Sequence, residues 1–312
     1  MRSSADIGAW WSYVYARLDG FEVRQAVLAK GRAAWTFGSK DRQEFAEFYA
    51  DAATGMGSSS GSSSSRLLGL ACTGPVTFTG HDLIKRDTEN MKAALAGSSA
   101  AEGFMTAVSP ATLQILPNEY YASQEDYTWA LAEAIREEYE AIVNPGFILQ
   151  IDDPAIVDLY DWWFSLKDDM AGYRKWAAPQ VEALNHALRN IPEDRVRYHI
   201  CWGSWHGPHK TDVPLKDVVD LVLRVNAQAY SLEAGNVRPE HEWKVWKQTR
   251  LPAGKLLIPG VVSHATNVLE HPEMIADRLV AYASAVGREN VIAGTDCGLG
   301  GRVHHQLAWA KL

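Results

Sequence analysis

Short strand-like runs alternate with amphipathic helical stretches along most of this 312-residue chain. The runs are rich in Val, Ile and Leu, and the stretches between them carry apolar residues at helical spacing. This alternation predicts βαβ units and therefore a parallel sheet. Seven candidate strands cover, in chain order, Arg66–Cys72, Gly103–Val108, Gly146–Ile151, Val196–Cys201, Gln228–Glu233, Lys255–Val262 and Asn290–Gly294.

The expected helices carry end signals. Ser123–Ile142 opens with a serine followed by early acidic residues, which is typical of a helix start. His271–Val286 has Pro272 in its first turn and Gly287 just past its end. Further helices are expected at Tyr173–Leu188, at Pro214–Asn226, and from Gln306 to the last residue, Leu312.

A closed barrel of eight strands, each followed by a helix, needs one strand more than the seven found. We therefore expect an α/β fold of the TIM (β/α)8 type that is incomplete at both ends. Its first strand is missing, since residues 1–66 contain no clear version of one, and its last helix is cut short at Leu312. The alternative is an open, doubly wound sheet. The barrel is favoured because the chemically active residues follow strand ends, where barrel enzymes carry their sites.

The whole chain, residues 1–312, is expected to form a single catalytic domain, interrupted by a flexible Gly/Ser loop at residues 55–65. A net charge of -8 without a basic stripe argues against nucleic acid as a partner. Three cysteines are few and odd in number, which argues against a disulfide framework. With no signal peptide or membrane-spanning stretch in view, we expect a cytoplasmic protein without a membrane partner.

Four successive candidate strands end in metal-binding or acid/base side chains. His199 and Cys201 lie one residue apart on a strand, so both point to the same face. Glu233, His264 and Cys297 follow the next three strands. Imidazole, thiolates and a carboxylate form a typical zinc ligand set, and the paired knuckles of a structural zinc ribbon are absent. Each residue alone has an ordinary structural explanation, but their common placement favours a catalytic Zn²⁺ site.

Two further segments offer substrate contacts. Asp152 and Asp153 end another strand, immediately before Pro154. Such carboxylates can hold a substrate ammonium group, and they can equally cap the next helix. Glu119 lies in a polar and aromatic loop after the preceding strand, where a substrate contact is also expected.

Four motifs together resemble the C-terminal catalytic barrel of cobalamin-independent methionine synthase. They are also similar to its single-barrel relatives, which include epoxyalkane:coenzyme M transferase-like proteins. The resemblance runs from Leu67 to Leu312, and its motifs, in chain order, are Ile151-Asp152-Asp153-Pro154-Ala155, His199-Ile200-Cys201, Ser231-Leu232-Glu233 and Thr295-Asp296-Cys297-Gly298-Leu299. It implies a zinc site made by His199, Cys201, Glu233 and Cys297. It also implies that His264 is the catalytic acid/base and that Asp152 binds the amino group of the thiol substrate.

The resemblance implies zinc-dependent transfer of a methyl or alkyl group to a small-molecule thiol. Methionine synthesis from homocysteine with a methyltetrahydrofolate-type donor is the model reaction, and the alternative is epoxide or alkyl transfer to a thiol such as coenzyme M. Two other classes stay open: a zinc lyase or hydrolase that uses metal-bound water, and a truncated zinc-binding barrel without turnover. Because an incomplete barrel leaves sheet edges open, a homodimer that covers the seam is expected.

Overall fold

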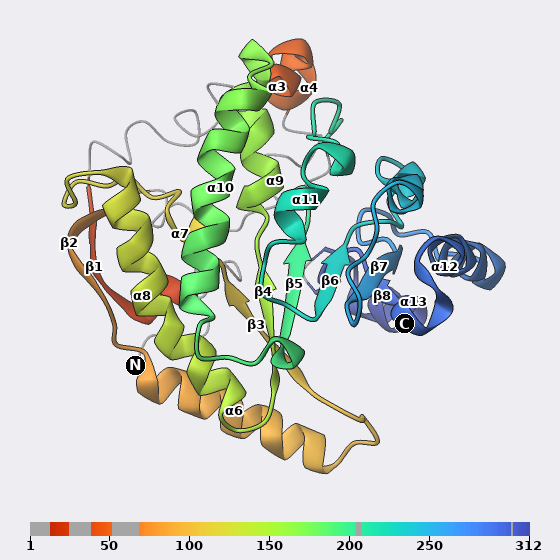
Figure 1. Ribbon diagram of the computed structural model, residues 1–312, viewed down its shortest axis with the longest axis horizontal. Coiled ribbons are helices and arrows are strands. Elements are labelled where there is room, and N and C mark those ends of the chain that lie inside the picture. Colours follow the sequence, from red (N-terminus) through yellow and green to blue (C-terminus); the bar gives the residue numbers. More distant parts are fainter. Residues whose placement is uncertain (1–12, 25–38, 52–68, 204–206, 301) are drawn as a thin grey trace.

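Six parallel strands form a curled sheet at the centre of the protein, seen in a computed structural model (Figure 1). The structure describes residues 13–24, 39–51, 69–203, 207–300 and 302–312, so the Gly/Ser loop predicted at residues 55–65 lies outside the described residues. Neighbouring strands follow chain order, as in successive βαβ units: β3 (Phe104–Val108), β4 (Ile148–Asp152), β5 (Val196–Ile200), β6 (Ala229–Leu232), β7 (Leu256–Val262) and β8 (Gly294–Thr295).

Six of the seven predicted strands are thereby confirmed, with boundaries shifted by a few residues. The parallel order is also confirmed, because each pairing from β3 to β8 is parallel. The described residues form a half-barrel, an α/β arrangement that places the carboxyl ends of all six strands along one rim. Side chains that follow these strands therefore meet at that rim.

The first predicted strand has a different role from the one expected. Its described part belongs to β2 (Leu70–Phe78), which pairs antiparallel with β1 (Leu18–Val23) outside the parallel sheet. Strand β1 lies in the region where the sequence offered no clear strand, and it forms an antiparallel pair with β2 instead of serving as a barrel strand. A single bridge between Cys72 and Asn118 connects this strand pair to the loop that follows β3.

Long helices cover the sheet, among them α6 (His81–Ala96), α8 (Gln124–Val143), α10 (Met170–Ala187), α12 (Pro272–Val286) and the shorter α13 (His305–Lys311). The helix-start signal at Ser123 is confirmed, because its hydroxyl accepts the backbone N–H of Asp126 at 3.0 Å. In Figure 1 the β1–β2 strand pair lies beside α8, and α12 and α13 lie at the opposite end of the sheet. No described helix is long and apolar enough to cross a membrane.

The predicted length of the helix over Pro214–Asn226 is wrong. A 3-10 turn at Leu215–Asp217 and the single turn α11 (Val219–Val222) occupy this range. The Leu215 N–H, a donor of the expected first turn, is bonded instead to the buried Glu242 carboxylate at 2.8 Å. A first-turn N–H has no partner within its own helix, so this bond satisfies that donor and does not account for the shorter helix.

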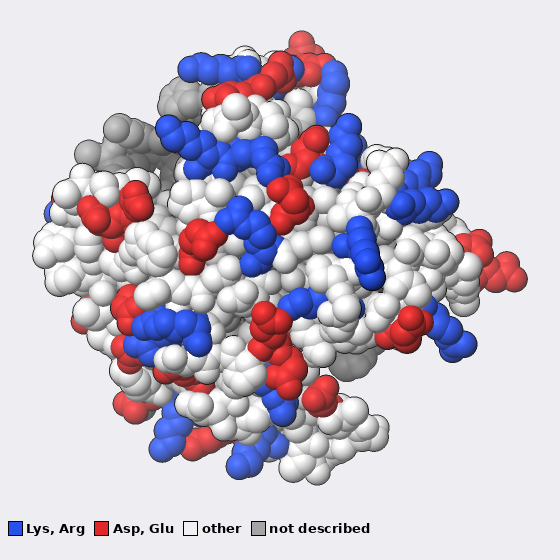
Figure 2. Space-filling model, viewed as in Figure 1, with Lys and Arg blue, Asp and Glu red and all other residues white. Residues whose placement is uncertain are grey.

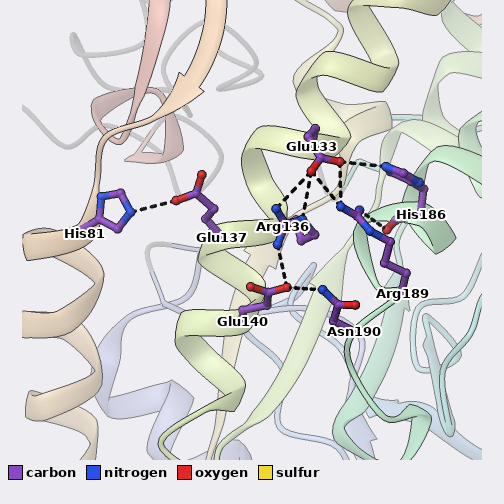
Figure 3. Close-up of polar contacts among 8 residues, drawn as sticks. All are labelled: His81, Glu133, Arg136, Glu137, Glu140, His186, Arg189 and Asn190. Atoms are coloured by element: carbon purple, nitrogen blue, oxygen red, sulfur yellow. Dashed lines mark hydrogen bonds and ion pairs between the residues drawn. The ribbon is translucent and has the colours of Figure 1, made fainter.

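Charged side chains of both signs are interspersed over the face shown in Figure 2. Between α8 and α10 they form a network in which Glu133 accepts hydrogen bonds from Arg136 and Arg189 and pairs with His186 (Figure 3). The hydrogen bond from Arg189, followed by that from His186, lowers the pKa of Glu133 to about 2. Exposed pairs of this kind add little stability each, so the network mainly fixes how the two helices lie.

Candidate metal site

Three potential metal ligands converge at the rim of the half-barrel. His199 on β5, Cys201 just past β5 and Cys297 just past β8 place their ligand atoms within 4.8 Å of one another. His199 and Cys201 are buried, and Cys297 is partly buried. The juxtaposition that the sequence predicted for these three residues is therefore present in the fold.

The two ring nitrogens of His199 have different surroundings. Nδ1 lies 3.1 Å from the Ser231 hydroxyl, on the neighbouring strand and in register with His199. Nε2 is buried and has no well-formed hydrogen bond to any described residue. A ligand histidine commonly has one nitrogen held by a neighbouring group while the other faces the metal. The donor set therefore fits a metal ion, with Ser231 orienting the imidazole.

The local electrostatics favour the ligand form of Cys297 but not that of His199, whose ligand form is the neutral imidazole. The interaction with Cys201, followed by that with the nearby His199, lowers the pKa of Cys297 to about 2. Burial lowers the pKa of His199, but Cys297 and Asp152 outweigh it and leave that pKa raised. Thiolate is the form of cysteine that binds metal, and zinc is the ion most often bound by one imidazole and two thiolates.

Glu233, the fourth predicted ligand, lies beside this group of three rather than within it. It follows β6 and is 5% exposed. Burial, followed by the charges of Asp296 and Cys297, raises its pKa to about 8. The carboxylate is thus near enough to interact electrostatically with Cys297 and His199. That Glu233 is a metal ligand stays a prediction.

Asp296 links the loops that carry Glu233 and Cys297, a role that the sequence did not reveal. Its Oδ1 accepts the N–H groups of Ala234 at 2.8 Å and Gly235 at 2.7 Å, and its backbone precedes Cys297. A Cβ at Gly260 would lie 2.4 Å from the same oxygen, so only glycine allows β7 to pass this close. The fully buried carboxylate therefore sets the spacing between the β6 and β8 loops.

His264 lies two residues past β7, and it is 1% exposed. The last residue of β7, Val262, pairs with Thr295 of β8, so His264 and Cys297 leave adjacent strands at the same rim. This position is compatible with the predicted acid/base role, which stays a prediction.

The two adjacent aspartates have separate environments. Asp152 pairs in register with His199, and burial raises its pKa to about 6 although the charge of His199 opposes the shift. Asp153 is fully engaged in the fold: its Oδ1 accepts the Ser109 hydroxyl at 2.6 Å and its Oδ2 the Tyr198 hydroxyl at 2.8 Å. Asp152 is therefore the better placed of the two for a substrate, and Asp153 braces the β4 loop.

Glu119, the remaining predicted substrate contact, interacts with residues of the β1–β2 strand pair and its flank. Its carboxylate pairs with Arg24 at 3.0 Å, and its N–H donates to the Cys72 carbonyl at 2.9 Å. These described contacts anchor the loop after β3 and do not connect it with the metal ligands.

A small cleft of about 20 Å³ opens beside Glu233, and His209 lines it. The His209 Nδ1 lies 3.1 Å from the Asp212 carboxylate. Its backbone has a φ of 53°, unusual for a residue other than glycine, and Arg238 donates to its carbonyl at 2.7 Å. The cleft therefore allows a small molecule such as water to reach Glu233.

The fold and this rim of ligands define a catalytic domain of the half-barrel α/β type. The chain belongs to the cobalamin-independent synthase catalytic domain family, whose model matches residues 38–312. It is 26% identical over 185 residues to a methionine synthase of Sulfolobus acidocaldarius, covering 58% of this chain and 45% of that protein. It is 24% identical over 207 residues to a 2-hydroxypropyl-CoM lyase of Xanthobacter autotrophicus, covering 58% of this chain and 50% of that protein.

The chain thus spans about half the length of the curated relatives that it matches. Among solved structures it is similar to a B12-independent methionine synthase from Shewanella sp. W3-18-1 in complex with selenomethionine. That match has a TM-score of 0.59 at 20% identity, covering 78% of this chain and 67% of the other. The structure of a putative B12-independent methionine synthase from Listeria monocytogenes matches with a TM-score of 0.56 at 21% identity, covering 78% of this chain and 70% of the other. These structural likenesses support the fold.

Proposed function

We propose that this chain catalyses the zinc-dependent transfer of a methyl or other alkyl group to a thiol. The observation that carries the proposal is the convergence of His199, Cys201 and Cys297 at the rim where parallel strands end. Family membership supports the transferase class. The model reaction is methionine synthesis from homocysteine with a methyltetrahydrofolate-type donor. The likeness to a 2-hydroxypropyl-CoM lyase supports transfer to a thiol such as coenzyme M as the second candidate.

His199, Cys201 and Cys297 would hold the zinc ion, with Glu233 as a displaceable fourth ligand. Bound zinc supplies a site at which a thiol stays deprotonated near neutral pH. Around it, Ser231 holds the His199 ring, and Asp296 fixes the loops of Glu233 and Cys297.

The remaining residues serve the organic substrates. Asp152, beside His199 in the sheet register, would bind the amino group of the thiol substrate. In the transfer step the thiol sulfur forms a bond to the alkyl carbon, and the bond from that carbon to its nitrogen or oxygen breaks. The electron pair stays on the departing atom, and His264 would donate a proton to it.

We also propose the architecture and setting in which this site works. Residues 1–312 would act as one domain, with the half-barrel belonging to an eight-stranded TIM barrel, as the likeness to the methionine synthase structures supports. A cytoplasmic location suits three cysteines that form no disulfide. A homodimer would cover the open edge of the sheet.

Thiol dependence is the decisive test of the reaction class. Zinc-loaded protein should convert a methyl or epoxide donor only when a thiol is present, and the thiol should be recovered as its thioether by mass spectrometry. Turnover without any thiol would instead identify a hydrolase or lyase that uses metal-bound water. Stoichiometric zinc with no transfer across the panel of thiols and donors would identify a binding protein without turnover.

The raised pKa of Glu233 makes a pH-dependent prediction about zinc affinity. With a pKa of about 8, this group holds a proton at neutral pH in the metal-free chain, and a metal must displace that proton. Glu233 should therefore contribute a decrease of up to about tenfold per pH unit to the zinc affinity as the pH drops below 8. Chelator competition measures the slope. In Glu233→Gln the slope should decrease by about one proton, and an unchanged slope would exclude Glu233 as a ligand.

A further inference from the structure

Helix α13 ends in a lysine whose side chain is fully buried. The Lys311 ammonium group donates to the Val268 carbonyl at 2.7 Å and to the two carboxylate oxygens of Glu270 at 3.0 and 2.8 Å. The Lys311 side chain is 0% exposed, and that of Glu270 is 8% exposed. A lysine ammonium group has three N–H donors, and these three acceptors can use all of them. Because an unpaired buried charge is costly, the two side chains hold each other in place.

The same Glu270 carboxylate holds the backbone just past β7. Its Oε1 accepts the Ser263 N–H at 2.9 Å, so Lys311 is connected to Ser263 through a single side chain. Ser263 is buried, and a backbone N–H that donates to a carboxylate makes a strong, charge-assisted hydrogen bond. His264 is the next residue along the chain. The position of its backbone therefore depends on this bond.

The peptide group between Val262 and Ser263 is held at both of its polar ends. Its N–H donates to Glu270, and its carbonyl oxygen accepts the N–H of Asp296 at 2.9 Å. A peptide group is planar, so a bond at one end restrains the direction of the other. This peptide group therefore ties the loop after β7 to the loop after β8.

Asp296 extends the connection to the candidate metal ligands. It immediately precedes Cys297, and its Oδ1 accepts the N–H groups of the two residues that follow Glu233. A displacement of the Val262–Ser263 peptide group would therefore reach the loops after β6, β7 and β8 together.

We propose that Lys311 and Glu270 are positioning residues that fix the loops of His264 and Cys297 at the rim of the half-barrel. They act through the Ser263 backbone and not by contact with the metal or the substrate. The inference rests on the proposed function, which assigns metal binding and proton donation to these loops. It makes helix α13, on the outside of the sheet, a determinant of the geometry of the site.

Lys311→Met tests the assignment, because methionine fills much of the same space without the charge. Glu270 then lacks its buried partner and should turn toward solvent, which releases the Ser263 N–H. Zinc affinity, measured by chelator competition with Zn²⁺ alone, should fall about 10-fold, the lower end of the loss expected when a group that orients a ligand is removed. A thermal transition that stays cooperative separates this effect from unfolding.

Amide hydrogen exchange gives a readout that requires no bound metal and no activity. In the metal-free Lys311→Met variant, exchange should become faster in residues 262–270 and 294–298, the two segments that the pair restrains. Exchange in β4 and β5 should stay as in the wild-type protein.

Lys255→Met is the matched control. Lys255 also donates to a backbone carbonyl, that of Ala227 at 2.8 Å, and it also pairs with a carboxylate, that of Glu193. It lies just before β7, at the amino end of the strand and away from the rim. Its replacement should therefore leave zinc affinity within about twofold, because distant sites act independently, and should leave exchange in the rim loops unchanged.

The double variant Lys311→Met, Glu270→Gln separates positioning from simple packing of α13. The glutamine oxygen can still accept the Ser263 N–H, and no buried charge is left without a partner. Zinc affinity should therefore return to within about threefold of the wild-type value, because removal of both charges avoids the cost of breaking the pair.

Wild-type zinc affinity in Lys311→Met would overturn the inference. Faster exchange throughout the sheet would overturn it as well, because it would assign a general stabilising role to Lys311. So would a double variant that binds zinc no more tightly than Lys311→Met. Wild-type protein that binds no zinc would instead refute the proposed function, and the exchange pattern would then decide by itself whether the pair positions the two loops.

Discussion

Replacement of Cys201 by alanine is expected to lower zinc affinity by more than about 100-fold, so that the purified variant contains almost no metal. The substitution removes one of three donors that lie within 4.8 Å of one another. Loss of a group that merely orients a ligand already costs about 10- to 100-fold in affinity, and loss of the ligand itself should cost more. Elemental analysis gives the stoichiometry, and chelator competition gives the affinity.

Cys72→Ala is the matched control, because Cys72 is also buried and reduced but lies on β2, outside the group of ligands. It should retain one zinc per chain. The Cys201 variant should also keep a cooperative thermal transition, which separates metal loss from unfolding. Full zinc content in Cys201→Ala would contradict the site, and equal losses in both cysteine variants would show that the effect comes from the fold rather than from ligation.

The juxtaposition of His199, Cys201 and Cys297 could be predicted from sequence because it depends on one simple periodicity and on the order of the strands. Alternation along a strand puts His199 and Cys201 on one face. The parallel order of the strands then brings Cys297 to the same rim. Neither argument needs knowledge of which residues pair across strands. For the same reason the fold class could be inferred from the alternation of strands and helices alone.

The supporting residues could not be predicted because they depend on register and on long-range contacts. Ser231 acquires its significance only once β5 is aligned with β6. Asp296 acts through the N–H groups of residues about 60 positions earlier in the chain. An isolated serine or aspartate in a sequence carries no signal of such partners.

Strand β1 was missed for a related reason. Its sequence, Leu-Asp-Gly-Phe-Glu-Val, contains residues with low strand propensity, and Gly20 adopts a φ of 96°. Close packing also requires that glycine, since a Cβ there would lie 2.7 Å from the Pro75 carbonyl oxygen. The strand is thus specified by its partner β2 and by the anchoring of the residues before it, not by its own pattern.

That anchoring makes a strong prediction for Arg17, which precedes β1. Its guanidinium donates to the Glu138 carboxylate of α8 at 2.7 Å, and the two side chains are 7% and 0% exposed. Asp87 lies 3.7 Å from the same guanidinium. Arg17→Met should lower the free energy of unfolding by about 3–5 kcal/mol, because it leaves a buried carboxylate without its partner. Urea denaturation at pH 8, where Glu138 of the wild-type protein is ionised, measures the loss.

The pH dependence of this loss gives a second measure of its cause. Burial raises the pKa of Glu138 to about 7, although Arg17 opposes the shift. Folding therefore favours the protonated acid, and the stability that this protonation contributes is lost as the pH rises through 7. Without Arg17 the pKa should rise further. The destabilisation of Arg17→Met should therefore be smaller near pH 5 than near pH 8, since protonation removes the unpaired charge.

Two comparisons decide whether the ion pair, rather than packing around Arg17, accounts for the effect. The double variant Arg17→Met, Glu138→Leu removes both charges and should recover much of the lost stability, because a buried ion pair can often be replaced by apolar groups. Arg86→Met removes an exposed arginine that pairs with Asp87 and should change stability by less than about 1 kcal/mol. The Arg17 side chain also packs against Gly80, where an added Cβ would lie 2.3 Å from the Arg17 Cβ. If the double variant is no more stable than Arg17→Met and the loss does not depend on pH, this packing, and not the ion pair, anchors β1.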